Sequence, residues 1–156
     1  MNKFFKFNEF IELGKIFSDC EAYLIALEHF DKAIAMSYLP INKERLIEAY
    51  ELRGGVKVFL TKYWESIDDF SRAIELDPNN AKYYAFRGSL KYDYSRFRKA
   101  LIDYNKAISL DSLNSSYYMN KAQVFLELGQ QNESLELINK AIEFDSLAGY
   151  FLDKIF

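Results

Sequence analysis

The sequence predicts an all-α protein, a superhelix of about four stacked helix pairs, and three observations carry this prediction. The words SRAIELDPNN, NKAISLDSLN and NKAIEFDSLA repeat at a spacing that places Ala73, Ala107 and Ala141 34 residues apart. Each repeat holds two stretches with apolar residues at helical spacing. Half of all residues (50%) are hydrophobic, so such helices can bury their apolar faces against one another. A fixed period of this length is typical of stacked repeats, in which each unit contacts only its neighbours.

The first repeat is expected over about residues 7–40, and the register slips after it. From Ala33 to Ala73 the spacing is 40 residues, six more than the period, and the additional residues lie around Ile41–Leu46. Asn42 is a good helix N-cap, and the residues after it favour helix. We therefore expect either a longer first helix in the second repeat or a longer loop before it.

Three more repeats follow, over about 47–80, 81–114 and 115–148, and residues 149–156 are expected to form a short closing helix. The turn Asp77-Pro78-Asn79-Asn80 ends the second repeat, because proline cannot continue a helix. Together the repeats are expected to form a single domain over 1–156. The eight main helices are predicted near 5–18, 21–37, 43–60, 63–76, 81–94, 97–110, 115–128 and 131–144.

The repeat at 81–114 resembles the tetratricopeptide repeat (TPR), and the resemblance extends over nearly the whole chain. Small and aromatic residues stand at the spacing of the TPR signature: Tyr84, Gly88, Ala100, Tyr104 and Ala107. The words YAFRGSLK and YELRGGVK are similar to a variant frequent in bacterial members. Departures are small, such as Ser66 and Ser134 where alanine is usual. The resemblance implies antiparallel helix pairs in a right-handed superhelix, whose concave face commonly binds a peptide or another protein.

Charge and composition exclude several classes of function. The formal net charge is −3, which disfavours binding to nucleic acid. No stretch approaches the roughly 20 apolar residues that a membrane span needs, and the N-terminus has no secretory signal. With the single cysteine Cys20 no internal disulfide can form. We therefore expect a cytoplasmic protein without nucleic-acid or membrane partners.

No constellation of residues predicts catalysis, a metal or a cofactor, so the chain is expected not to be an enzyme. The only histidine, His29, has neither a nucleophile nor an orienting acid nearby in sequence, and is expected to be a surface or lightly packed residue. Cys20 lies between Asp19 and Glu21, which disfavour a reactive thiolate. Gly54-Gly55 falls inside a helical pattern rather than in a phosphate-binding loop.

The TPR resemblance implies which residues face the concave groove. Carried over position by position, the groove-facing residues of repeats two to four are Leu52, Gly55, Phe59, Lys82, Phe86, Ser89, Tyr92, Met119, Asn120 and Gln123, and repeat one adds Ile11, Glu12 and Lys15. Most other aromatic residues fall on core positions, among them Phe10, Phe30, Tyr50, Phe70, Tyr84, Tyr104 and Tyr118. Exposed Leu52, Phe59, Phe86 and Tyr92 would form an apolar band of the kind that marks binding surfaces. Alternatively, these side chains pack on each other or on a neighbouring molecule.

The groove residues predict a partner that is apolar to mildly basic. Some TPR proteins grip acidic chaperone tails with a clamp of cationic side chains, and the matching positions here lack that cationic pair. Acidic residues are expected near the groove instead: Glu12, Glu48, Glu51, Asp93 and Glu127. The predicted function is a non-enzymatic module that binds a protein or peptide segment. The alternatives are a small bacterial secretion-type chaperone, which needs a longer helical region before the first repeat than the six residues here, and an RNA-binding helical repeat.

Two further predictions concern charges and ends. Arg and Asp occur together as Arg53 with Asp69 and as Arg87 with Asp103, whereas repeats one and four lack both. Since a partly buried charge needs a partner, we expect an ion pair in at least one repeat.

The ends are apolar, with Phe4 and Phe5 at one and Phe151, Ile155 and Phe156 at the other. Because terminal repeats need polar caps, this predicts self-association through an end or a natural chain that continues past Phe156.

Overall fold

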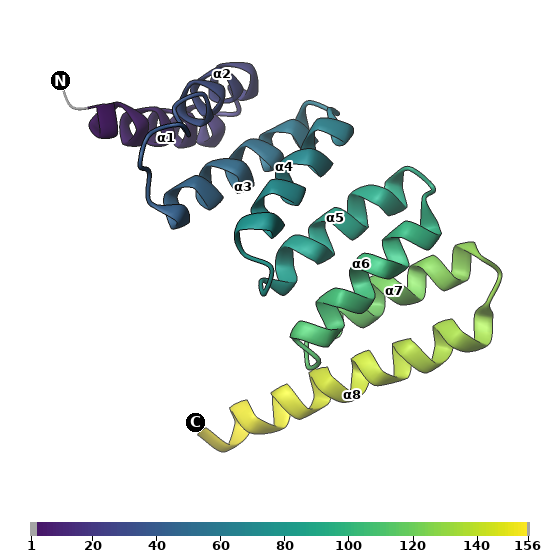
Figure 1. Ribbon diagram of the computed structural model, residues 1–156. Coiled ribbons are helices and arrows are strands. Elements are labelled where there is room, and N and C mark those ends of the chain that lie inside the picture. Colours follow the sequence, from purple (N-terminus) through teal and green to yellow (C-terminus); the bar gives the residue numbers. More distant parts are fainter. Residues whose placement is uncertain (1–2, 156) are drawn as a thin grey trace. The chain divides into compact units, whose positions relative to one another are not determined.

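The computed structural model describes the backbone of residues 3–155 and the side chains of residues 5–145. Within these residues the structure is all-α, with helices joined by short turns and no strand (Figure 1). The helices are α1 (Lys3–Asp19), α2 (Tyr23–Ile34), α3 (Lys43–Phe59), α4 (Tyr63–Leu76), α5 (Ala81–Asp93), α6 (Phe97–Leu110), α7 (Ser115–Glu127) and α8 (Gln131–Ile155). Eight main helices were expected near these positions, and the all-α prediction is confirmed.

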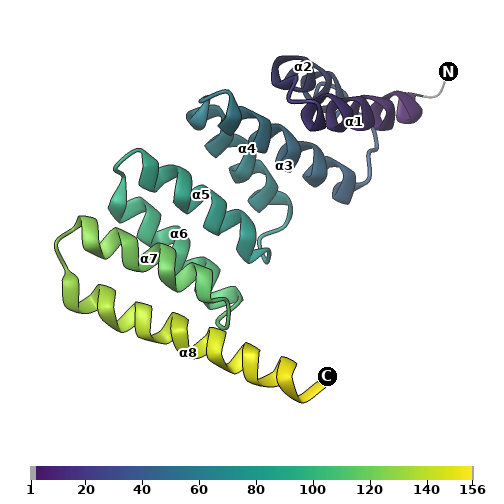
Figure 2. The same ribbon diagram turned by 180° about the vertical axis from the view of Figure 1, so that it is seen from behind.

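The chain divides into two compact units, Met1–Pro78 and Asn79–Phe156. The boundary lies in the turn that the sequence marks as the end of the second repeat. Each unit contains two helix pairs, α1/α2 and α3/α4 in the first and α5/α6 and α7/α8 in the second (Figure 2). The single domain over 1–156 stays a prediction, and the two units are described separately below.

In the first unit the core forms where α1, α2 and α3 meet. Phe7, Ile11 and Phe30 are fully buried there, together with Ala26 and Ala33. The alanines fall on one side of α2 at helical spacing, which lets the neighbouring helices approach closely while the aromatic rings fill the space between them. This is the helix packing that the repeat pattern predicts.

In the second unit, aromatic residues pack against small ones in the same way. Tyr104 of α6 lies against Gly88 of α5, and a Cβ added to Gly88 would come within 2.9 Å of the Tyr104 ring. A second cluster joins α7 to α8 through Tyr118, Ala122 and Ala141. Of the seven predicted core aromatics, Phe30, Phe70, Tyr84, Tyr104 and Tyr118 are buried, whereas Phe10 and Tyr50 are half-buried.

The first helices of repeats two to four begin at asparagine caps. The Oδ1 atom of Asn42 accepts hydrogen bonds from the backbone N–H groups of Glu44 (2.7 Å) and Arg45 (3.3 Å). Asn80 and Asn114 cap α5 and α7 in the same way. Because α3 begins at Lys43, the insertion mainly lengthens the first helix of the second repeat: α3 has 17 residues, whereas α5 has 13.

The turn inside each helix pair passes through a residue with left-handed backbone. The four residues are Glu21, Thr61, Ser95 and Gly129, with φ between 55° and 73°. Only the last is glycine, the residue that adopts this conformation without strain. The tight turns therefore do not depend on a glycine signal, and the sequence placed them through the helix pattern alone.

Two expectations about helix ends are wrong. The separate closing helix over 149–156 is instead the continuation of α8, which runs unbroken from Gln131 to Ile155, and Phe156 lies outside the described residues. No proline or capping turn interrupts the segment before Gly149, and one glycine in a helix costs only about 1 kcal/mol. The second helix, expected over 21–37, ends at Ile34 and is followed by a turn.

Candidate functional site

The second unit has an open pocket of about 370 Å³ between α5 and α7. Four of its lining residues, Lys82, Phe86, Ser89 and Asn120, belong to the predicted groove. The α5 residues fall at spacings of three and four, so one helix face supplies that side of the pocket. The lining is completed by Ala85 and by Asn114, Ser116 and Tyr117.

The polar side chains in this pocket differ in whether they already form hydrogen bonds within the protein. Ser89 is committed to the protein itself, because its Oγ lies 3.1 Å from both the Ala85 carbonyl oxygen and the Tyr104 hydroxyl. The Asn120 amide is half-buried and makes no hydrogen bond within the described part of the chain. The Lys82 side chain is exposed and forms no ion pair with any described residue. Asn120 and Lys82 are therefore the groups with hydrogen-bonding capacity to spare.

Phe86 and Tyr92, the two aromatic groove residues of α5, have different surroundings. Phe86 lines the pocket and keeps 51% of its surface exposed. The Tyr92 hydroxyl donates to Oε1 of Glu127 at 3.2 Å, and its ring lies 5.6 Å from that of Phe97. Burial and the neighbouring Glu127 carboxylate raise the pKa of Tyr92. Tyr92 thus joins the end of α5 to the end of α7, and lies outside the pocket lining.

Two predicted residues on α7 also lie outside the pocket lining: Met119 and Gln123, both exposed. The sequence missed four lining residues, Ala85, Asn114, Ser116 and Tyr117. A signal for Tyr117 was available, since it stands one helical turn before Asn120 on the same face of α7.

In the first unit, the predicted groove residues of α3 are less open than expected. Leu52 is only half-exposed and packs against the core cluster. Phe59 is 65% exposed, and one face of its ring stacks on Tyr23, with centroids 4.6 Å apart. Gly55 faces open space, because a Cβ added there would meet no atom of another residue within 4 Å. The expectation of an exposed Leu52 is wrong, because its side chain packs against the core cluster that α1, α2 and α3 form.

The groove positions carried over from repeat one do not form a binding surface. Ile11 is fully buried in the core, so its assignment to the groove is wrong. Glu12 and Lys15 take part in an ion-pair network with Arg45 and Glu48. Arg45 stands in the additional first turn of α3, so the insertion itself supplies the cation that neutralises these acids.

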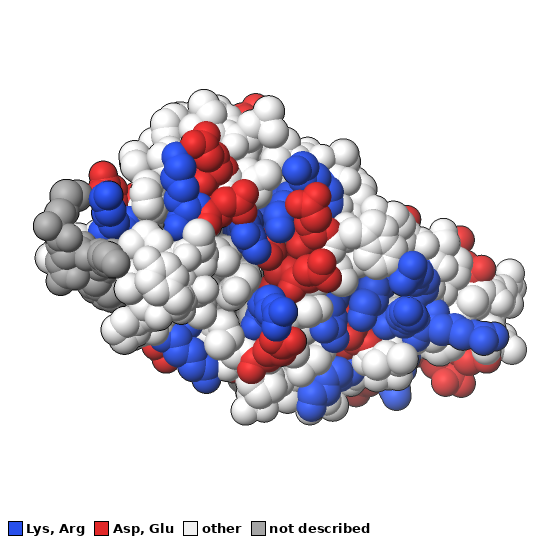
Figure 3. All heavy atoms as spheres, turned by 45° about the horizontal axis from the view of Figure 1, so that its top comes forward, with Lys and Arg blue, Asp and Glu red and all other residues white. Residues whose placement is uncertain are grey.

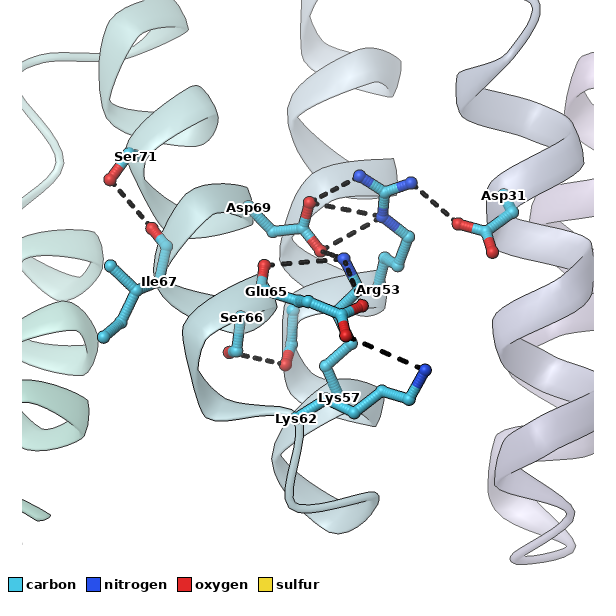
Figure 4. Close-up of polar contacts among 10 residues, drawn as sticks. Asp31, Arg53, Lys57, Lys62, Glu65, Ser66, Ile67, Asp69 and Ser71 are labelled. Atoms are coloured by element: carbon cyan, nitrogen blue, oxygen red, sulfur yellow. Dashed lines mark hydrogen bonds and ion pairs between the residues drawn. The ribbon is translucent and has the colours of Figure 1, made fainter. Parts of the chain in front are cut away.

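The expected arginine–aspartate ion pair forms in both repeats. In the first unit the Arg53 guanidinium binds Asp69 through Nε (3.0 Å) and Nη2 (2.6 Å), and its Nη1 reaches Asp31 at 2.7 Å (Figure 4). Lys57 adds a second cation 2.8 Å from Asp69, which is 2% exposed. The sequence did not predict the role of Lys57, although its place one turn after Arg53 was a signal for it.

The same triad recurs in the second unit, where Asp103 binds Arg87 (2.8 Å) and Lys91 (2.6 Å). In the fourth repeat Leu137 replaces the aspartate, and Lys121 stands in the place of the arginine. Lys121 is half-buried with the Phe125 ring against its ammonium group, and burial together with Lys140 lowers its pKa. The triads tie the two helices of a repeat together and have no chemistry of a catalytic site.

No group of three or more His, Cys, Asp or Glu side chains within the described residues could hold a metal ion. His29 is half-buried, with its ring stacked on Phe17 at 5.3 Å, and Cys20 is exposed and free. No described helix is long and apolar enough to cross a membrane. On the face shown in Figure 3, acidic and basic side chains are interspersed over much of the surface.

The helix pairs, their spacing and the small-residue packing are those of the tetratricopeptide repeat fold. Residues 115–146 match the family model of the tetratricopeptide repeat. No curated protein sequence matches the chain significantly.

Solved structures of TPR proteins share this fold. A crystal structure of MamA superposes with a TM-score of 0.83 at 22% sequence identity. The alignment covers 92% of this chain and 81% of the MamA chain. MamA from Desulfovibrio magneticus RS-1 has a TM-score of 0.80 at 16% identity, with 90% and 76% covered. YrrB, described as a TPR protein with an unusual peptide-binding site, has a TM-score of 0.71 at 21% identity, with 84% and 64% covered. These similarities establish the fold.

Proposed function

We propose that this chain is a non-enzymatic protein-interaction module, which binds a peptide or protein segment on the faces of its first helices. The pocket between α5 and α7 is the observation that carries the proposal. It combines an exposed aromatic ring with an amide and an ammonium group that have hydrogen-bonding capacity to spare, on two rigid helices. YrrB, which shares the fold, is described as having a peptide-binding site.

The partner that fits the pocket is an extended segment with an apolar side chain. The Phe86 ring, which is half exposed, offers contact area with little rotamer entropy to lose. The Asn120 amide can both donate to and accept from a backbone peptide group. A partner that is apolar to mildly basic remains the proposal. The basic preference rests on Glu51, Asp93 and Glu127, which lie outside the pocket lining, since Glu12 and Glu48 are paired within the first unit. We propose a cytoplasmic location, where Cys20 stays reduced.

Site-specific photo-crosslinking tests the proposed binding face. A photoreactive phenylalanine analogue at Phe86 should crosslink a defined segment of a partner, which mass spectrometry identifies. The matched control carries the same analogue at Ile102, which is 67% exposed on α6 and outside the pocket. Crosslinks of equal yield at both positions would contradict the pocket assignment.

Binding of the identified segment can then be measured with pocket variants. Phe86→Ala combined with Asn120→Ala should weaken it by about 2–4 kcal/mol, because a few central residues dominate such interfaces. Ile102→Ala, which removes a similar amount of exposed apolar surface, should leave the affinity unchanged. Tyr92 is unsuited to this test, because its bond to Glu127 links two helices.

A further inference from the structure

A second pocket of about 490 Å³ opens at the turn between α5 and α6 and carries positive charge. Its lining consists of Ser95, Arg96, Phe97, Arg98, Lys99 and Leu128, so three of six residues are cationic and none is acidic. Phe97 and Leu128 supply apolar walls. This pocket is distinct from the one between α5 and α7, with which it shares no residue.

Two of these cations have no partner among the described residues. The side chains of Arg98 and Lys99 are exposed and form no ion pair or hydrogen bond there. At the corresponding turn of the first unit, Lys62 lies 3.8 Å from Glu65 of α4. At the turn before α8, the Gln130 side chain donates to Glu133 at 2.8 Å. The α5–α6 turn therefore differs from these two in having unpaired positive charge.

The position of these cations is unfavourable for the helix that carries them. Arg98 and Lys99 are the second and third residues of α6, where the helix dipole favours acidic side chains. Glu65 and Glu133 occupy the third position of α4 and α8. The residue before α6, Arg96, provides no side-chain acceptor for the first backbone N–H groups. The positive side chains and the positive end of the helix dipole therefore raise the electrostatic potential at the start of α6. A bound anion would lower the energy of this arrangement.

We propose that the α5–α6 turn is a docking site for an acidic protein segment that carries an apolar side chain. Carboxylates of the segment would pair with Arg98 and Lys99, and its apolar side chain would lie against Phe97 and Leu128. The apolar walls favour such a segment over an inorganic anion. The net charge of −3 opposes long-range attraction of a nucleic acid. The ligand differs in charge from the apolar to mildly basic partner of the α5–α7 pocket, so the two sites are separate.

The test uses the full chain and a fluorescent ten-residue peptide made of Glu, Asp and Leu, with a matched peptide in which Gln and Asn replace the acids. Binding followed by fluorescence anisotropy should be seen for the acidic peptide only and should weaken as salt is added. Arg98→Glu with Lys99→Glu should reduce the affinity about tenfold or more, the loss expected for two ion pairs replaced by repulsion. Because the two glutamates suit the start of α6, this variant should remain folded.

Lys43→Glu provides the control, since it places a glutamate at the exposed first position of α3, outside the lining of both pockets, and should leave the affinity for the acidic peptide unchanged. Amide chemical-shift changes on peptide addition should centre on residues 95–99 and Leu128. The proposal is overturned if the acidic peptide does not bind. It is equally overturned if the Arg98/Lys99 variant binds it at full strength, or if inorganic phosphate or anionic lipid vesicles compete it away at lower concentration. Failure of the Phe86 crosslinking experiment leaves this site unaffected.

Discussion

At the scale of single residues, the buried charges show what each repeat needs to be stable. Asp69 is 2% exposed and lies between Arg53 and Lys57. A carboxylate can be buried in this way because both cations are held on the facing helix. Removal of the aspartate takes the one buried carboxylate away from both cations, which is costly.

Asp69→Asn should therefore destabilise the protein by about 3 kcal/mol, since Arg53 and Lys57 would lose the buried carboxylate between them and keep only the exposed Asp31 and Glu65 as partners. Chemical denaturation followed by circular dichroism measures this change. The neighbouring Asp68→Asn, at an exposed position, is the control and should change the free energy of unfolding by less than about 0.5 kcal/mol. Equal effects for the two variants would show that the triad contributes nothing.

Lys121 represents the opposite case, a half-buried cation without a carboxylate partner among the described residues. Its pKa is lowered by burial and by Lys140, so in the pH range between its folded and unfolded pKa the unfolded state binds more protons, and stability rises with pH. Lys121→Met should raise the thermal midpoint at pH 7 and stabilise by about 0.5 kcal/mol, a small value because water screens a half-exposed group.

The stability difference between Lys121→Met and the unchanged protein should then shrink as the pH rises towards the ordinary lysine value of about 10.4. Thermal unfolding at several pH values measures it. Lys82→Met, at an exposed position, should show no such trend. A difference that grows with pH would contradict the assignment.

At the scale of helices, the space around a glycine shows how closely its helix packs against a neighbouring helix. Gly88 of α5 faces the Tyr104 ring, whereas Gly55 of α3 faces open space. Both lie inside helices, where glycine costs about 1 kcal/mol relative to alanine. Of these two, only Gly88 has a packing reason within its own unit to be glycine.

Gly88→Ala should destabilise by about 1–3 kcal/mol, because the added methyl group would force the Tyr104 ring away. Gly55→Ala should instead stabilise by about 0.5–1 kcal/mol through the better helix propensity of alanine. Thermal and denaturant unfolding compare the two variants. If Gly55→Ala also weakens partner binding, the open space at Gly55 belongs to the binding surface. Destabilisation by Gly55→Ala would refute the open space itself.

At the scale of the whole molecule, the end of a repeat array determines whether the chain associates with itself. On α8, Leu135 and Ile142 are 58% and 57% exposed. They stand seven residues apart and so lie on one face of the helix. A hydrophobic face of this kind is what an internal repeat would bury against its neighbour. At the other end Phe5 is 67% exposed, while the predictions for Phe4, Phe151, Ile155 and Phe156 concern side chains outside the described residues.

We therefore expect either self-association through the outer face of α8 or a natural chain that continues past Phe156 and covers this face. In the first case, sedimentation velocity over a range of concentrations should show a dimer that Leu135→Glu with Ile142→Glu weakens about tenfold or more, because each glutamate would have to be desolvated in the interface. Ile102→Glu on α6 is the control and should leave the association unchanged. A monomer at all concentrations before mutation would rule self-association out.

The sequence alone determined the repeat architecture and most helix bounds. The apolar spacing depends only on residues close in sequence, and the same pattern recurs in each repeat with a period of 34 residues. The pairing of Arg53 with Asp69 was also readable, since both residues appear together in two repeats and are absent together in the others. The Asn42 cap was predicted for a related reason, because capping depends only on the next few residues. The family positions of Phe86 and Asn120 placed both residues in the groove, and both line the pocket between α5 and α7.

Only the tertiary structure decided which of the candidate groove residues are open. Leu52 and Ile11 pack into the core cluster that α1, α2 and α3 form, and Tyr92 is committed to Glu127, 35 residues away. Exposure and pairing of this kind depend on contacts between helices that are distant in sequence, so no local pattern encodes them. The continuous α8 and the basic pocket at the α5–α6 turn likewise emerged from geometry. The sequence pattern did not show that α8 continues past residue 144, because the absence of a helix stop leaves no positive signal. Leu128 comes to lie beside Arg98 and Lys99 only when α7 packs against α6.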